Sequence, residues 1–204
     1  MFISIEGIEG TGKSTLAATL VNHLQNSKQV VLTREPGGTP IAESIRKLIL
    51  HDHPDEKILP KAELLLMFAS RIQHIETIIK PALNKGCWVI SDRFVDASFA
   101  YQGGGRGLNS QQISSISKFA LDDFKPDLTL LLDLDVKSAE IRIANKNKDK
   151  IEQEDSLFFQ QVREAYLARA KSDPKRIKVI SAKLSPKNIF DQAIHHIKEL
   201  TNEL

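Results

Sequence analysis

Short apolar runs alternate along the chain with longer stretches whose apolar residues recur at helical spacing. The apolar runs show little polar alternation, as buried parallel strands do, and they predict strands at residues 2–6, 29–33, 88–91, 128–134 and 176–180. Helical periodicity predicts helices near residues 13–26, 40–50, 61–84, 110–122, 137–146, 154–172 and 186–200. Strand–helix alternation of this kind predicts an α/β fold, a mostly parallel sheet with helices on both faces.

Glycine and proline positions refine this pattern. Gly86 follows the periodic run that ends at Lys85 and indicates a helix end, whereas Pro81 within that run predicts a kink or an early end. Residues 103–107 and 145–150 break the alternation, and both segments are typical of mobile surface loops. We find no internal repeat and no interdomain linker, so we expect a single domain over residues 1–204.

The composition excludes several classes of protein. With 204 residues, 41% of them hydrophobic and 26% charged, the chain can bury a sizeable core and is not largely disordered. A net charge of +2 is too small to indicate nucleic acid or a membrane as the main partner. The single cysteine, Cys87, excludes an internal disulfide and a cysteine metal cluster, and it favours a reducing cytoplasm. No apolar run reaches the roughly 18 residues of a membrane span, and we expect no signal peptide ahead of Gly7.

One motif points to a nucleotide. Residues 7–14 read GIEGTGKS and fit G-x-x-x-x-G-K-[ST], with a predicted strand before them and a predicted helix after them. The glycines let the backbone N–H groups point inward at a polyphosphate, and the helix N-terminus adds partial positive charge. Lys13 would reach the β- and γ-phosphates, and Ser14 would ligate Mg²⁺. A glycine-rich turn without a ligand is the alternative.

Further candidates lie at the carboxyl ends of predicted strands, where open parallel sheets bind ligands. Asp92 is placed to hold Mg²⁺ and Arg93 to hold a phosphate; a structural salt bridge is the alternative. Glu9, a carboxylate beside a phosphate cradle, indicates a second ligand such as a sugar hydroxyl or a cation, unless it is a solvated rim residue. Residues 33–39 (TREPGGT) form a shaped turn at the same edge or an ordinary strand-to-helix loop.

Taken together, the segments GIEGTGKST, TREPGGT, SRIQHIE, SDRFVDASFAYQGGGRG, FKPDLTLLLDL and DKIEQED resemble those of bacterial thymidylate kinases. The match runs from Gly7 to about Tyr166. It implies transfer of the ATP γ-phosphoryl group to dTMP, forming dTDP and ADP in dTTP biosynthesis, with Mg²⁺. It also implies the P-loop NTPase kinase fold, with a five-stranded parallel sheet and a short lid over about residues 143–153, and a cytoplasmic homodimer.

The resemblance also implies roles for individual residues. The ATP-binding set comprises Gly7, Ile8, Glu9, Gly10, Thr11, Gly12, Lys13, Ser14, Thr15 and, beside adenine, Arg142. The dTMP-binding set comprises Glu9, Glu35, Pro36, Arg46, Met67, Arg71, Arg93, Ser98, Tyr101 and Gln102. In it, Arg93 resembles the arginine on the phosphate, Arg71 the arginine on a thymine carbonyl, and Tyr101 the tyrosine under the sugar. Ser14 and Asp92 would hold magnesium, and the catalytic set is Lys13, Arg93 and Lys150.

The chain departs from the family pattern at two places. The family usually has an aromatic residue four positions before the cleft arginine, where this chain has Met67 followed by Phe68. Helix neighbours point about 100° apart, so only one of the two can face thymine, and we interpret Phe68 as a core residue. The lid carries Lys146, Lys148 and Lys150 where related enzymes carry arginines, and we assign the contact with the transferred group to Lys150. Ala182 and Asn188 match loosely the region that closes over the base.

Two other functions stay open at this stage. One is a kinase of the same architecture that acts on dUMP, CMP or a nucleoside. The other is a nucleotide-dependent switch or binding module, although we find no guanine-reading N-K-x-D motif, and residues 147–149 lack its spacing.

Overall fold

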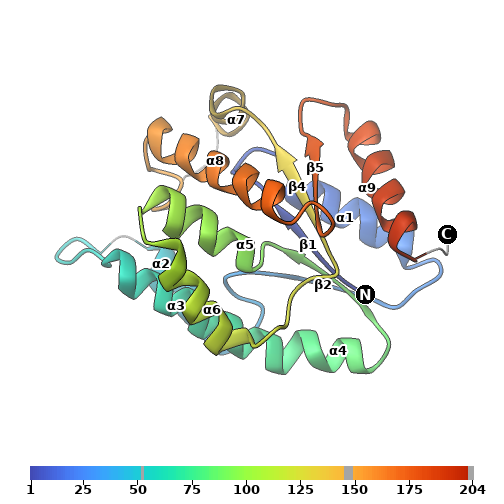
Figure 1. The fold of residues 1–204 in the computed structure, drawn as a ribbon, viewed down its shortest axis with the longest axis horizontal. Helices are drawn as coiled ribbons and strands as arrows, with labels where there is room; N and C mark the ends of the chain where they lie inside the picture. The colour runs from blue at the N-terminus through green and yellow to red at the C-terminus, as the bar shows by residue number, and fades with distance from the viewer. Residues whose placement is uncertain (52, 145–148, 202–204) are drawn as a thin grey trace.

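The computed structural model describes residues 1–51, 53–144 and 149–201. Its centre is a five-stranded sheet with the order β2-β3-β1-β4-β5, in which every neighbouring pair of strands is parallel (Figure 1). The strands are β1 (Phe2–Glu6), β2 (Val30–Arg34), β3 (Trp88–Asp92), β4 (Leu128–Asp133) and β5 (Ile177–Ser181). The predicted α/β fold is confirmed, and each predicted strand lies within about one residue of an observed one.

Helices cover both faces of this sheet (Figure 1). They are α1 (Lys13–Leu24), α2 (Pro40–Leu50), α3 (Pro60–His74), α4 (Lys80–Asn84), α5 (Val95–Ser98), α6 (Ser110–Leu121), α7 (Val136–Ile143), α8 (Ser156–Ser172) and α9 (Pro186–Thr201). Two π-helical segments, η1 (Ile75–Ile79) and η2 (Phe99–Gly105), continue α3 and α5. The short helix α5 and segment η2 were not among the predicted helices.

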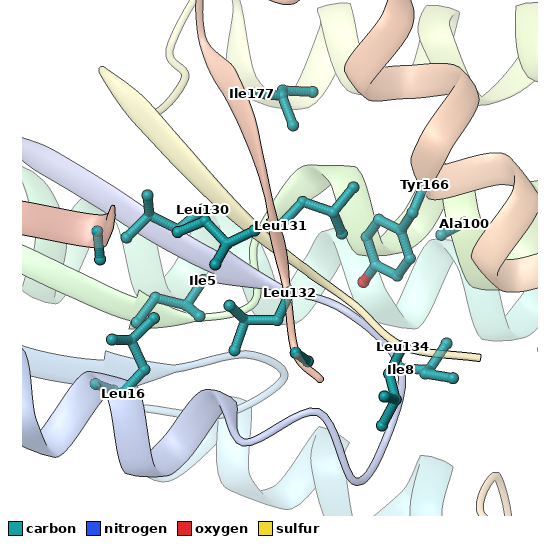
Figure 2. Close-up of a cluster of buried hydrophobic side chains, with 14 of the residues drawn as sticks. Ile5, Ile8, Leu16, Ala100, Leu130, Leu131, Leu132, Leu134, Tyr166 and Ile177 are labelled. Carbon is teal, nitrogen blue, oxygen red and sulfur yellow. The ribbon is translucent and has the colours of Figure 1, made fainter. Parts of the chain in front are cut away.

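The core is built from the two faces of the central strands. β1 is buried at every position, and Ile3 pairs with Ile90 of β3 on one side and with Leu128 of β4 on the other. In the larger cluster of buried side chains, Leu16 of α1 and Tyr166 of α8 lie on opposite sides of the strands (Figure 2). Because both faces are covered, the strands read as continuous apolar runs in the sequence.

The long helix predicted over residues 61–84 is divided in the structure. A π-helical segment, η1, ends two residues before Pro81, and Pro81 lies in the first turn of α4, a position that tolerates proline. The helix does not end early at Pro81 but continues to Asn84, and the π-helical segment before it is the departure from a regular α-helix. The predicted helix end is confirmed, since α4 stops at Asn84 and Gly86 follows with a φ of 76°.

The prediction of a mobile surface loop at residues 103–107 is wrong for the first three residues. They belong to η2, which packs closely against α8. A Cβ atom at Gly104 would lie 2.6 Å from the carbonyl oxygen of Gln161, and one at Gly105 would overlap the Phe158 ring. These glycines thus serve close helix packing rather than flexibility. Of the other predicted loop, residues 145–148 lie outside the described part of the chain.

Candidate active site

The loop between β1 and α1 curls at its glycines. Gly7, Gly10 and Gly12 have φ angles of 137°, 76° and 91°, which disfavour residues with a Cβ atom. The Lys13 ammonium donates to the Ile8 carbonyl at 2.9 Å, and the Thr11 hydroxyl donates to the same oxygen at 2.8 Å. The loop therefore has the geometry of a phosphate cradle with its lysine folded over it.

Burial and neighbouring charges shift the pKa values of Lys13 and Glu9, the two charged residues of the loop. Burial lowers the pKa of Lys13 to about 8, and the Arg93 charge adds to this effect, whereas Glu9, Asp92 and Glu6 oppose it. Burial raises the pKa of Glu9, but Arg93, Lys13 and the Tyr101 hydroxyl outweigh it, so this pKa lies below its usual value. At neutral pH the site thus contains a lysine that is still mostly protonated and a carboxylate that stays ionised.

Two oxygen ligands lie together beside the cradle. The Ser14 hydroxyl at the start of α1 donates to a carboxylate oxygen of Asp92, the last residue of β3, at 2.8 Å. Both residues line the same cavity. Hydroxyl and carboxylate oxygens are hard donors of the kind that Mg²⁺ takes together with phosphate oxygens, so the predicted pair fits this ion.

A cavity of about 400 Å³ opens beside the loop. It brings together every residue of the predicted dTMP-binding set: Glu9, Glu35, Pro36, Arg46, Met67, Arg71, Arg93, Ser98, Tyr101 and Gln102. Phosphate-loop residues line the same space: Gly10, Gly12, Lys13, Ser14 and Thr15. The phosphate-loop residues and the predicted acceptor residues therefore line one cavity.

Arg93 occupies an unusual backbone conformation at the end of β3. Its φ is 72°, and its guanidinium donates to the Gly7 carbonyl at 2.8 Å and to the Glu9 carboxylate at 2.5 Å. The guanidinium carbon lies 4.8 Å from the centre of the Tyr101 ring, whose hydroxyl donates to Glu9. Burial lowers the pKa of Arg93, but Tyr101 and Glu9 outweigh it, so this pKa lies well above its usual value. The arginine is therefore a fixed cation facing the phosphate loop.

Arg71 of α3 is fixed by its contacts with three segments. Its Nε donates to Glu35 at 2.6 Å, its Nη1 to the Ser98 hydroxyl at 3.0 Å, and its Nη2 to the Phe94 carbonyl at 3.1 Å. The other Glu35 oxygen pairs with Nδ1 of His74 at 2.9 Å. The planar guanidinium is thereby held at the cavity wall, in an orientation set by the protein.

The structure separates Met67 from Phe68. Met67 lines the cavity, whereas Phe68 belongs to the second core cluster and packs with its ring centre 4.9 Å from the Arg71 guanidinium carbon. The interpretation of Phe68 as a core residue is confirmed. A thioether, rather than an aromatic ring, therefore stands at this position of the cavity wall.

Some predicted residues lie outside the cavity lining. Arg142 of α7 donates to the carbonyls of Gly10 at 3.2 Å and Ala182 at 2.9 Å, so it joins the phosphate loop to the turn after β5. The backbone N–H of Lys150 donates to the Leu50 carbonyl at 3.3 Å, and the cavity is lined by its neighbours Asp149, Ile151 and Glu152. The predictions for Lys146 and Lys148 fall outside the described residues.

Sequence reasoning missed several buried polar residues around the site. Glu63 accepts a hydrogen bond from the Gln102 amide at 2.8 Å and pairs with Arg106, and His74 holds Glu35. His74 lies three positions after Arg71, on the same side of α3, and this spacing was the available signal. Glu63 has no such signal, because its partners come from η2 and the residue after it.

In the part of the chain that the structure describes, no helix has both the length and the apolar character that crossing a bilayer requires.

Comparison with known proteins gives one consistent result. The family model described as thymidylate kinase matches residues 5–193. The thymidylate kinase of Chromohalobacter salexigens is 48% identical over 201 residues, covering 97% of this chain and 95% of the relative. That of Ruthia magnifica is 51% identical and covers 89% of each chain. The solved thymidylate kinase of Ehrlichia chaffeensis superposes with a TM-score of 0.79 at 33% identity, covering 97% of this chain and 98% of its own. With a phosphate loop, an adjoining cavity of the predicted composition and these similarities, the chain belongs to the thymidylate kinase family.

Proposed function

We propose that this chain transfers the γ-phosphoryl group of ATP to dTMP and so forms dTDP and ADP for dTTP biosynthesis. The observation that carries the proposal is the shared cavity, in which the phosphate-loop Lys13 and the acceptor-side residues Arg71 and Arg93 line one space. Membership of the thymidylate kinase family supports the same substrates.

The proposed reaction needs little covalent chemistry from the protein. An anionic oxygen of the dTMP phosphate attacks the γ-phosphorus, and the bond to the ADP oxygen breaks, so no general base is required. Lys13 and Arg93 act as fixed cations for the charge that spreads over the transferred group. Mg²⁺ held by Ser14 and Asp92 supplies further charge neutralisation on the triphosphate when it is bound.

The roles of the acceptor residues are those that the family resemblance implies, and the shared cavity supports them because all of these residues line it. Arg93 binds the dTMP phosphate, Arg71 binds a thymine carbonyl, and Ser98 and Gln102 read the edge of the ring. Tyr101 is 5% exposed and donates to Glu9, so its ring forms a wall that would reject a ribose hydroxyl. The resemblance implies that Glu9 lies near the sugar 3′-hydroxyl.

The proposal extends to the lid, which we place at about residues 143–153. We assign the contact with the transferred phosphoryl group to Lys150, since its main chain is tied to the end of α2 and its neighbours line the cavity. Lid closure would exclude water and protect ATP from hydrolysis.

We also propose a cytoplasmic homodimer. Helices α2 and α3 pack side by side, and each exposes two large apolar side chains seven positions apart: Ile41 and Leu48 on α2, and Leu65 and Ile72 on α3. Exposed apolar side chains on two neighbouring helices favour association with a second copy. Light scattering behind a sizing column tests the dimer. A reducing compartment agrees with Cys87, which forms no disulfide.

A coupled assay of ADP release tests the reaction. Purified protein with ATP and Mg²⁺ is given dTMP, dUMP, CMP or thymidine in turn, with an acceptor-free reaction as the control. We expect the highest kcat/KM with dTMP and only slow ADP release without an acceptor. No dTDP at saturating dTMP, ATP and Mg²⁺ would contradict the proposal, and a preference for another monophosphate would replace dTMP as the acceptor.

A further inference from the structure

A buried carboxyl group lies directly behind Arg93 and touches no part of the cavity. Glu6, the last residue of β1, is completely buried, and it is not among the residues that line the cavity. One of its oxygens accepts the backbone N–H of Phe94 at 2.7 Å. This bond fixes the peptide that follows Arg93, at the point where the Arg93 backbone adopts its φ of 72°.

The second oxygen of Glu6 reaches Arg93 by another route. It accepts the hydroxyl of Tyr166, on α8, at 2.7 Å, and the Tyr166 oxygen accepts Nη1 of Arg93 at 3.2 Å. The Tyr166 ring extends from α8 towards the strands and is 2% exposed (Figure 2). Its ring meets that of Tyr101 edge to face, with centres 6.2 Å apart. The hydroxyl is therefore held by the carboxyl group and the arginine, and the ring by its contact with Tyr101.

We infer that Glu6 and Tyr166 are positioning residues for phosphate binding: together they hold both the backbone and the guanidinium of Arg93 in the orientation that binds the acceptor phosphate. The inference rests on the proposed function, in which Arg93 holds that phosphate. A long side chain loses much rotamer freedom when it is fixed, and prior fixing by the protein removes this cost from ligand binding. Glu9 and the Gly7 carbonyl hold the guanidinium from the loop side. Glu6 and Tyr166 hold it from the core side.

The protonation of Glu6 gives the inference a sharp control. Burial and, to a lesser degree, the Asp96 charge raise the pKa of Glu6 to about 8, while Tyr166, Arg93 and the Phe94 N–H oppose this. At neutral pH the group is therefore mostly a neutral acid, and glutamine reproduces both its shape and its charge. The ionised group accepts from both Phe94 and Tyr166, whereas in the neutral acid the oxygen facing Tyr166 can carry the proton and donate to the Tyr166 oxygen, as an amide would.

Calorimetric titration of dTMP and of ATP, combined with steady-state kinetics, tests the inference on four single variants. Tyr166→Phe removes one hydrogen bond to Arg93, and we expect a rise of about 5-fold in the Kd and KM for dTMP. Glu6→Ala removes both connections and is expected to raise them about 10-fold or more, whereas Glu6→Gln should stay within about 2-fold of the parent. ATP affinity should change by less than about 2-fold in all of them. Ser4→Ala is the matched control, because Ser4 is a buried hydroxyl on the same strand that bonds to Thr129 and not to Arg93.

A double-mutant cycle separates positioning from general stability. In an Arg93→Lys background, Tyr166→Phe should cost less than about 2-fold in dTMP affinity, since its effect passes through the guanidinium. If Glu6→Ala fails to fold, Tyr166→Phe and the cycle decide alone. Unchanged dTMP affinity in Tyr166→Phe, or an equal loss in the Arg93→Lys background, would overturn the inference. If the parent protein does not phosphorylate dTMP at all, it is the proposed function that fails.

Discussion

Replacing Lys13 with methionine should make the protein more stable while it abolishes phosphoryl transfer. Lys13 is 8% exposed, and its ammonium group donates to one backbone carbonyl, that of Ile8. Burial lowers its pKa from the ordinary 10.5 to about 8, so the folded protein holds this charge at a cost. In the proposed function, the lysine serves the phosphates that it would bind and not the stability of the fold.

The size of the effect follows from the pKa. At about 1.4 kcal/mol for each pKa unit, the lowering corresponds to about 3 kcal/mol of stability lost at neutral pH. Methionine also loses the hydrogen bond to Ile8, which is worth about 1 kcal/mol, so the expected net gain is about 1 to 3 kcal/mol. The folded pKa lies below the unfolded one, so the cost is fully present below pH 8 and disappears as the pH rises towards 10.5.

Urea unfolding without nucleotide, at a pH near 7 and again at a pH near 9.5, measures this directly. We expect the stability advantage of Lys13→Met over the parent to be large at the lower pH and much smaller at the higher one. Lys175→Met, at an exposed lysine, is the matched control and should change stability by less than about 0.5 kcal/mol. A Lys13→Met protein less stable than the parent, or an advantage that does not shrink with rising pH, would refute this account of the lysine.

Further predictions concern stability, binding and the lid. Asp96→Asn leaves Arg169 and Arg176 facing a neutral amide and should lower the free energy of unfolding in urea by about 3 to 5 kcal/mol. A loss below about 1 kcal/mol would contradict a stabilising ion-pair network. Gly104→Ala should cost about 1 to 3 kcal/mol in the same measurement, and clearly more than Gly103→Ala, whose Cβ would meet a flexible isoleucine tip. Arg71→Lys removes the planar fork and should raise the KM for dTMP about 10-fold or more, with the KM for ATP unchanged. Lys150→Ala should lower kcat strongly, and an unchanged kcat would remove this residue from the catalytic set.

Much of the fold follows from the sequence because parallel strands covered on both faces must be apolar along their length. The predicted strand at residues 128–134 shows this most clearly, since residues 128–133 form β4 next to the centre of the sheet. The π-helical segments were beyond such reasoning. η1 continues the helical pattern of apolar residues, whereas η2 ends in three glycines that favour a loop, so neither sequence signals the wider turn of a π-helix.

The glycine run at residues 103–107 shows why local composition misleads. Glycine clusters usually mark flexible loops, but Gly104 is glycine because α8 lies too close for a side chain. Only the contact with a segment about 60 positions further along the chain distinguishes the two cases. The same holds for Met67 and Phe68, since the direction of α3 relative to the cavity decides which of them reaches it.

The site residues that lie in contiguous motifs could be predicted from the sequence, whereas those whose partners are far apart along the chain could not. The phosphate loop is contiguous, and Asp92 and Arg93 follow a strand that could be identified from its apolar run, so pattern and topology sufficed for them. The acceptor residues came from family resemblance, and the cavity that gathers them agrees with it. Glu6 and Tyr166 are separated by 160 positions, and no spacing within the sequence could have paired them.

Two cations of the cavity, Arg71 and Arg93, share one structural property, which explains why buried carboxylates lie beside a proposed site for anions. Arg71 is held by Glu35, Ser98 and a backbone carbonyl, and Arg93 by Glu9 and the Gly7 carbonyl. An unpaired buried guanidinium would be costly, and a flexible one would have to be ordered by each substrate molecule. Pairing each arginine with a carboxylate removes the first cost and fixes the direction of the cation before the ligand binds. The carboxylate that pairs with each arginine also weakens the attraction of that arginine for a phosphate. Such a site therefore gains selectivity for a correctly shaped ligand more than it gains affinity. Phosphoryl transfer between two bound nucleotides requires this precise placement.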